Sequence, residues 1–249
     1  MEIPPRHEIP PHRRIMASPL DLTTIFFALL GGMLPAFLWL WFWLKEDKAH
    51  PEPKRIIAMA FLGGAVAVPA AFFFENLVTH YYAVGALVTI VLWAFIEEIL
   101  KFLGAYVAAL RRKENDEPVD NMIYLITAAL GFAAVENALF LLAPLSQGGI
   151  ADTLATGNLR FIGSTLLHVI CSSIIGIALA YSFCKTPGKK ALHAGVGVIL
   201  AALLHTLFNF FILNTENNLF LTFGVVWVLS IVLFLFFEKV KRLNRTCVY

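Results

Sequence analysis

Residues 84–110 read VGALVTIVLWAFIEEILKFLGAYVAAL. This segment is apolar and longer than the roughly 20 residues that a helix needs to cross a bilayer, yet it contains Glu97, Glu98 and Lys101. An ionisable side chain at the bilayer centre costs about 2.5 to 3.5 kcal/mol on insertion scales, so such residues usually face a protein interior and mark a functional site. We therefore expect a bundle of membrane helices in which this segment supplies part of a polar centre.

The whole chain has the composition of an integral membrane protein. Of its 249 residues, 59% are hydrophobic and 14% are charged, and the mean hydropathy is +0.76, whereas an average soluble domain carries about 25% charged residues. The net charge of +2 gives no support to nucleic-acid binding. Lys and Arg instead form short clusters between apolar runs, which is typical of membrane topology signals.

Seven apolar segments have the length of a membrane-spanning helix. They cover about residues 25–44, 56–74, 84–110, 122–142, 161–183, 191–213 and 219–237. The connections between them are short and carry turn residues such as Pro187 and Gly188. The sequence therefore predicts an all-α fold, a polytopic transmembrane helix bundle of about seven spans. We expect one domain at residues 25–237, flanked by tails at residues 1–24 and 238–249.

Basic residues predict the orientation, because Lys and Arg are enriched in cytoplasmic connections. The segments after the first, third, fifth and seventh spans hold fourteen of them, whereas the opposite connections hold only Arg160. We predict a multi-pass protein of a bacterial inner (cell) membrane with its C-terminal tail in the cytoplasm and residues 143–159 as an outside loop. The count conflicts only at Arg6, Arg13 and Arg14, and this conflict disappears if synthesis begins at Met16.

Four predicted spans place a carboxylate or an imidazole at a similar depth. With a rise of 1.5 Å per residue, Glu136 lies about 21 Å along its span, His205 lies at a similar height, and His168 lies roughly 10 Å below the outer surface. Glu97 and Glu98 fall between the midplane and the outer leaflet. We expect these side chains to converge in one layer.

The spacing of polar residues within each span refines this layer. Lys101 follows Glu97 by four residues, so the two share a helix face in the order that favours an ion pair. Glu98 lies about 100° around the helix and meets a different neighbour. The same interval of four relates Phe132 to Glu136 and His205 to Asn209.

These residue types suit hydrolysis of a peptide bond. A carboxylate beside a neutral imidazole can hold a water molecule and accept its proton, and a second imidazole with a carboxamide can donate hydrogen bonds to an oxyanion. Every Asp falls in a connection or a tail, and the chain lacks both Gly-x-Ser-x-Gly and His-Glu-x-x-His. We predict no cofactor, but a zinc ion stays open, with the ligands Glu98, Glu136, His168 and His205.

Together these motifs resemble the PrsW family of intramembrane proteases, within the wider group that contains the type II CAAX prenyl endopeptidases and the bacterial CPBP proteins. The motifs, in this order between about residues 84 and 211, are Glu97-Glu98-x-x-Lys101, Phe132-x-x-x-Glu136-Asn137, His168 and His205-x-x-x-Asn209.

The resemblance implies a role for each motif. Glu97 or Glu98 would activate water, and His205 with Asn209 would form the oxyanion site. Glu136 stands where the CAAX enzymes have a histidine, and His168 would supply the missing imidazole. The supporting residues would be Lys101, Phe132 and Asn137. The implied substrate is a single-span membrane protein, such as an anti-sigma factor, cut in regulated proteolysis.

A non-hydrolytic membrane protein is the alternative. Buried Glu, His and Lys also build proton relays, so a proton-coupled transporter or a membrane scaffold stays open. Transporters tend to have inverted repeats and broken helices near the midplane, and the sequence shows neither. The pair Glu75-Asn76 repeats Glu136-Asn137, but we expect it to end its helix and set it aside.

Overall fold

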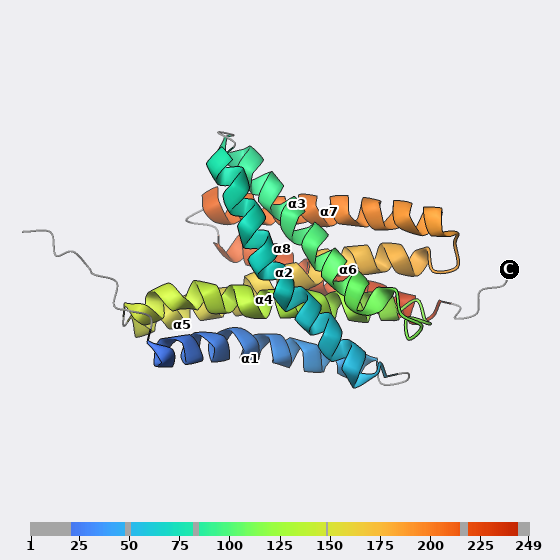
Figure 1. Cartoon of the computed structure of the whole chain (residues 1–249), viewed down its shortest axis with the longest axis horizontal. Coiled ribbons are helices and arrows are strands. Elements are labelled where there is room, and N and C mark those ends of the chain that lie inside the picture. Colours follow the sequence, from blue (N-terminus) through green and yellow to red (C-terminus); the bar gives the residue numbers. More distant parts are fainter. Residues whose placement is uncertain (1–20, 48–50, 82–84, 148, 215–218, 244–249) are drawn as a thin grey trace, which may run out of the picture.

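A computed structural model describes residues 21–47, 51–81, 85–147, 149–214 and 219–243, and all regular secondary structure within them is helical (Figure 1). The prediction of an all-α fold is therefore confirmed. The helices are α1 (Leu22–Glu46), α2 (Lys54–Tyr81), α3 (Ala86–Ala105), α4 (Asp120–Ser146), α5 (Ile150–Leu159), α6 (Thr165–Tyr181), α7 (Pro187–Asn214) and α8 (Leu219–Val240). Two π-helical turns, η1 (Tyr106–Leu110) and η2 (Arg160–Ser164), follow α3 and precede α6.

Each of the seven predicted segments coincides with a helix. Among the described residues, α1, α2, α4, α7 and α8 are long and apolar enough to cross a membrane. Helix α3 carries Glu97, Glu98 and Lys101, and α6 has only 17 residues. The chain is thus a multi-pass membrane protein, while the count of seven spans stays a prediction.

Residues 143–159 are mostly helical, so the prediction that they form a loop is wrong, while their position outside the membrane stays a prediction. Helix α4 continues to Ser146, and α5 begins four residues later at Ile150. Helix α5 is short and buries none of its residues, so a search for long apolar segments could not detect it. The turn η2 joins α5 to α6 without a break, and this places Arg160 inside a helical run rather than in a loop.

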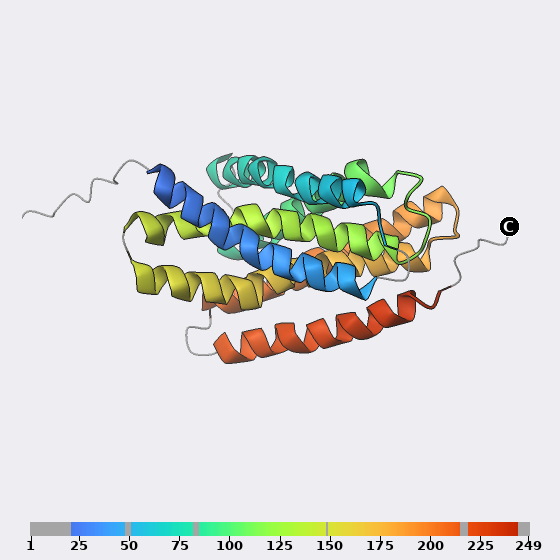
Figure 2. The same ribbon diagram turned by 90° about the horizontal axis from the view of Figure 1, so that it is seen from below.

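Helix α4 forms the centre of the bundle. Every residue from Asp120 to Ala134 is buried, as expected for a helix that is apolar on all sides. Figure 2 shows α4 between α2 on one side and α6 and α8 on the other. Small residues let the backbones approach: a side chain at Gly32 of α1 would collide with Ala134, and one at Gly131 would collide with the Phe61 backbone.

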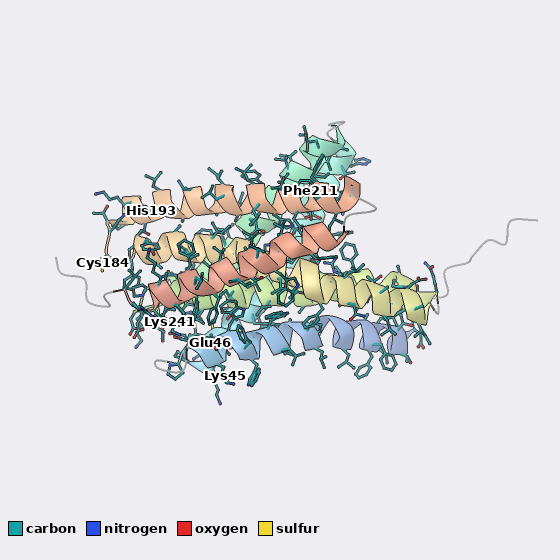
Figure 3. All side chains as sticks on the ribbon, turned by 180° about the vertical axis from the view of Figure 1, so that it is seen from behind. Lys45, Glu46, Cys184, His193, Phe211 and Lys241 are labelled. Carbon is teal, nitrogen blue, oxygen red and sulfur yellow. The ribbon has the colours of Figure 1, made fainter. Side chains whose placement is uncertain are left out.

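The four basic segments lie at the same end of the bundle (Figure 1). Lys241, after α8, donates a hydrogen bond of 3.0 Å to the Glu46 carbonyl at the end of α1. Figure 3 places Lys45, Glu46, His193 and Lys241 at this end, with Phe211 at the other. The expected tail at residues 1–24 lies mostly outside the described residues, and so does Met16, the alternative start. Helix α1 begins at Leu22.

Candidate active site

Glu98 links α3 to α7. Its side chain is fully buried, and its Oε1 accepts a hydrogen bond of 2.6 Å from Lys101 Nζ. The same oxygen lies 2.8 Å from Nδ1 of His205, which is also buried. Because both neighbours can donate a hydrogen bond to Glu98, this carboxylate is well placed to stay ionised away from water.

Lys101 forms its ion pair with Glu98. The spacing of four residues had predicted Glu97 instead, so that prediction is wrong. Positions three and four apart both share a helix face, so spacing alone could not decide between the two glutamates. Lys101 Nζ also lies 2.9 Å from His168 Nδ1 and 5.0 Å from the centroid of the Phe132 ring. The ammonium group is therefore enclosed by one carboxylate, one imidazole and one aromatic face, with no exposed surface on its side chain.

Arg160 is the site residue that the sequence analysis missed. Its Nη2 donates to Glu136 and, at 3.1 Å, to Ser164, while its Nε donates at 2.5 Å to Asn137. Its guanidinium carbon lies 3.8 Å from the Phe140 ring centroid. The signal that could have found it is its isolation: it is the one basic residue among the connections on its side of the chain.

Glu136 and Asn137 connect α4 to α6. Glu136 Oε2 lies 2.9 Å from Nε2 of His168, in addition to its bond with Arg160. Asn137 is buried and donates its side-chain amide to the Thr165 hydroxyl at 2.9 Å. Asn137 thus links α4 to α6 beside the cluster.

Glu97 faces the space between the two imidazoles. Its Oε2 lies 3.9 Å from His168 Nδ1 and 3.9 Å from His205 Nε2. This oxygen is buried and has no hydrogen-bond partner among the described residues. The two imidazole rings are 5.3 Å apart and nearly perpendicular, with an interplanar angle of 82°.

The structure brings most of the predicted site residues together. Glu97, Glu98, Glu136, His168 and His205 form one cluster, with Lys101 and Phe132 against it. Asn209 lies one helical turn beyond His205, is half-buried, and makes no side-chain hydrogen bond within the described part of the chain.

The expectation that Glu75 ends its helix is wrong. Helix α2 continues to Tyr81, and the side chains of Asn76 and Thr79 donate to the carbonyls of Phe72 and Glu75 one turn earlier. Glu75 lies inside α2, close enough to Glu136 and Lys101 to interact with them electrostatically. The sequence analysis thus set aside a carboxylate at the edge of the cluster.

The donor set fits a metal ion, but with different ligands from those expected at the sequence level. Glu97, His168 and His205 each offer an atom, and these atoms lie within 4.8 Å of one another. Glu136 and Glu98 instead contact the outer nitrogens of the two histidines, Nε2 of His168 and Nδ1 of His205. Carboxylates commonly hold metal-binding histidines in this way, and three protein ligands with one open position are typical of catalytic zinc sites.

A second donor set involves Cys171, which the sequence analysis did not single out as a ligand. Its buried, free thiol lies with Glu98 and His205. In this set Glu98 and His205 already contact each other at 2.8 Å. The set with Glu97 fits better, because Glu97 brings a buried oxygen without a partner among the described residues.

Known proteins are similar to this chain in sequence over most of its length. Residues 52–237 match the model of a family described as PrsW family intramembrane metalloprotease. Protease PrsW of Shouchella clausii (strain KSM-K16) is 26% identical, over 87% of this chain and 96% of its own. Protease PrsW of Clostridioides difficile (strain 630) is 28% identical, over 76% and 80%, and that of Bacillus subtilis (strain 168) is 21% identical, over 89% and 96%. No solved structure matches the chain. The chain therefore belongs to the PrsW family and is an intramembrane protease.

Proposed function

We propose that this protease hydrolyses a peptide bond of a single-span membrane protein, such as an anti-sigma factor, with a water molecule activated among Glu97, His168 and His205. The observation that carries the proposal is the buried Glu97 Oε2, which has no hydrogen-bond partner among the described residues. It lies 3.9 Å from a nitrogen of each histidine, and polar atoms separated by more than 3.5 Å are commonly bridged by water.

The outer contacts of the histidines support this role. Glu98 accepts a hydrogen bond from the Nδ1–H group of His205, so His205 Nε2 keeps its lone pair towards Glu97. Glu136 accepts a hydrogen bond from the Nε2–H group of His168, and His168 Nδ1 accepts a hydrogen bond from Lys101. These tautomers are assigned from the partners. Both imidazoles are then neutral, and His205 Nε2 keeps its lone pair towards Glu97, whereas the lone pair of His168 Nδ1 accepts from Lys101.

The proposed reaction begins with proton transfer from water to Glu97, while the hydroxide oxygen adds to the carbonyl carbon of the substrate. The carbonyl oxygen becomes an oxyanion, for which the proposed hydrogen-bond donors are Asn209 and His205, the latter after Glu97 has passed the proton from water to its Nε2. The proton then passes to the departing nitrogen, the carbon–nitrogen bond breaks, and a carboxylic acid and an amine leave. Lys101 and Arg160 act as positioning residues that hold Glu98 and Glu136 ionised.

The family description supports a metal in the protein, and the donor set offers residues that could hold it. We propose that Glu97, His168 and His205 hold the ion when Lys101 contacts Glu98 alone and leaves the lone pair of His168 Nδ1 free for it. A bound divalent ion supplies a nucleophilic water at neutral pH and polarises a carbonyl oxygen. In that arrangement Glu98 is the carboxylate left to accept the proton, since its Oε2 is also buried with no partner in the described part of the chain.

We further propose that residues 25–237 form the protease domain and that it lies in the cell membrane with the basic end in the cytoplasm. The four basic segments lie together at one end of the bundle (Figure 1), and the positive-inside bias assigns such an end to the cytoplasm. The substrate's extracytoplasmic part would then approach from the end that carries α5.

The test is cleavage of a single-span reporter by purified protein in proteoliposomes. We expect Glu97→Gln to reduce kcat at least about 100-fold, the usual range for loss of a general base, while leaving the helix content unchanged. Glu238→Gln is the matched control, because that carboxylate is 34% exposed and lies far along the chain from the cluster. Full activity of Glu97→Gln would refute the proposed role. Elemental analysis of both proteins reports whether Glu97 also holds a metal.

A further inference from the structure

Two apolar grooves meet at the basic end of α3. One, of about 850 Å³, lies between α3 and α7, and the other, of about 610 Å³, lies between α2 and α3. Leu103, Arg111 and Arg112 line both grooves. We propose that this place binds one anionic phospholipid, with its phosphate at Arg111 and Arg112 and one acyl chain in each groove.

Two arginines, Arg111 and Arg112, lie where the two grooves meet. Arg111 is exposed and Arg112 is half-buried, and their Nε atoms donate to the carbonyls of Val107 and Ala108. These bonds orient the guanidinium groups and leave the Nη donors for a ligand. No carboxylate of the described residues lies within 4.0 Å of either arginine. Planar guanidinium groups of this kind bind phosphate oxygens through paired hydrogen bonds.

A third cation stands on the opposite wall of the larger groove. Lys190 of α7 lines this groove, and its Nζ lies 5.0 Å from the ring centroid of Phe183. The charged residues that line the two grooves are then Arg111, Arg112 and Lys190, all basic. Such clusters beside membrane helices attract anionic lipid headgroups.

The lengths of the grooves suit acyl chains. Along α3 and η1 the larger groove is lined from Phe95 to Arg111, about 24 Å at the rise of an α-helix. Along α7 it is lined from Pro187 to Ile199, about 18 Å. The smaller groove is lined along α2 from Met59 to Ala70, about 16 Å. Half of a bilayer's hydrocarbon core is about 15 Å thick, so each groove can hold the chain of a lipid from one leaflet.

The turn η1 separates the two grooves. Tyr106, its first residue, lines the larger groove, and the next residue, Val107, lines the smaller one. A π-helical turn at this point is of the kind that often occurs at functional sites. The two chains of one lipid would thus pass on either side of the end of α3.

A third groove shows that this charge pattern is specific. It has about 590 Å³, lies between α1 and α2, and is also mostly apolar, but it is lined by Asp47 and Glu52 together with Lys54. Carboxylates repel a phosphate group. Selection of an anionic lipid is therefore expected at Arg111 and Arg112 and not at every groove of the bundle.

The first test is native mass spectrometry of the full chain released from nanodiscs of equimolar dioleoyl phosphatidylglycerol and dioleoyl phosphatidylcholine. We expect a one-to-one complex with phosphatidylglycerol to dominate. The double variant Arg111→Gln/Arg112→Gln should bind this lipid about thirtyfold more weakly, equivalent to ~2 kcal/mol for two cations near the membrane surface. The control Lys239→Gln/Arg242→Gln removes the same charge at the same end and should leave the complex unchanged.

The second test keeps the charges and fills a groove. Gly195 lines the larger groove, and a side chain added there meets no atom within 4 Å. We expect Gly195→Phe to reduce phosphatidylglycerol binding severalfold, and Gly224→Phe, at an equally open glycine of α8, to leave it unchanged. Equal binding of the two lipids by the unmodified protein would overturn the proposal. Unchanged binding in both the arginine double variant and Gly195→Phe would also overturn it.

Discussion

Replacement of Lys101 by methionine removes the cation at the centre of the polar cluster. Lys101 and Glu98 form an ion pair of 2.6 Å in which both side chains are fully buried. Methionine keeps most of the side-chain volume, but it leaves His205 as the only described residue whose side chain is hydrogen-bonded to Glu98. Breaking a buried ion pair by removing one partner costs about 3 to 5 kcal/mol, because the remaining charge is uncompensated.

The chain contains a matched control for this substitution. Lys241 and Glu238 have the same spacing of three and the same distance of 2.6 Å, but their side chains are 27% and 34% exposed. Exposed pairs contribute about 0 to 1 kcal/mol. We therefore expect Lys101→Met to destabilise the protein several times more than Lys241→Met does.

Thermal unfolding in detergent provides the assay. For a chain of this size about 2 to 4 °C corresponds to 1 kcal/mol, so Lys101→Met should lower Tm by roughly 6 to 20 °C, and Lys241→Met by at most about 4 °C. The double variant Lys101→Met/Glu98→Gln should recover part of the loss, because it removes the unpaired carboxylate. Equal shifts for Lys101→Met and Lys241→Met would refute the buried pair as a source of stability.

Three further predictions concern the site and its orientation. Arg160→Gln should lower kcat in the reporter cleavage assay by about 10- to 100-fold, as loss of a group that orients an active-site ligand commonly does. Arg160→Lys should not restore kcat, because one ammonium group cannot reproduce the planar guanidinium that contacts Glu136. Wild-type activity of either variant would contradict this prediction. Cys171→Ala should retain bound metal in elemental analysis, because the favoured donor set does not use the thiol, and loss of metal would move the site to the other set. With the native cysteines removed, a cysteine at Gln147 should react with a membrane-impermeant reagent in intact cells and one at Lys113 should not; the reverse pattern would overturn the orientation.

The sequence by itself determined the helices and the level at which their polar residues lie. Apolar runs and their lengths are local properties, so seven segments could be placed without any knowledge of packing. Rise per residue then put Glu98, Glu136, His168 and His205 at one depth, and the structure joins them through hydrogen bonds. Depth along a helix depends only on counting residues, which explains why this part of the site could be predicted.

Only the tertiary structure decided which side chains meet within that layer. Spacing allowed Lys101 to pair with either glutamate, and the rotation of α3 against α6 and α7 selected Glu98. Arg160 appeared to lie in a loop, and it became a partner of Glu136 because α5 and η2 extend the helical run before α6. The rotation of a helix about its own axis depends on its neighbours, and a single sequence read along its length does not contain those contacts.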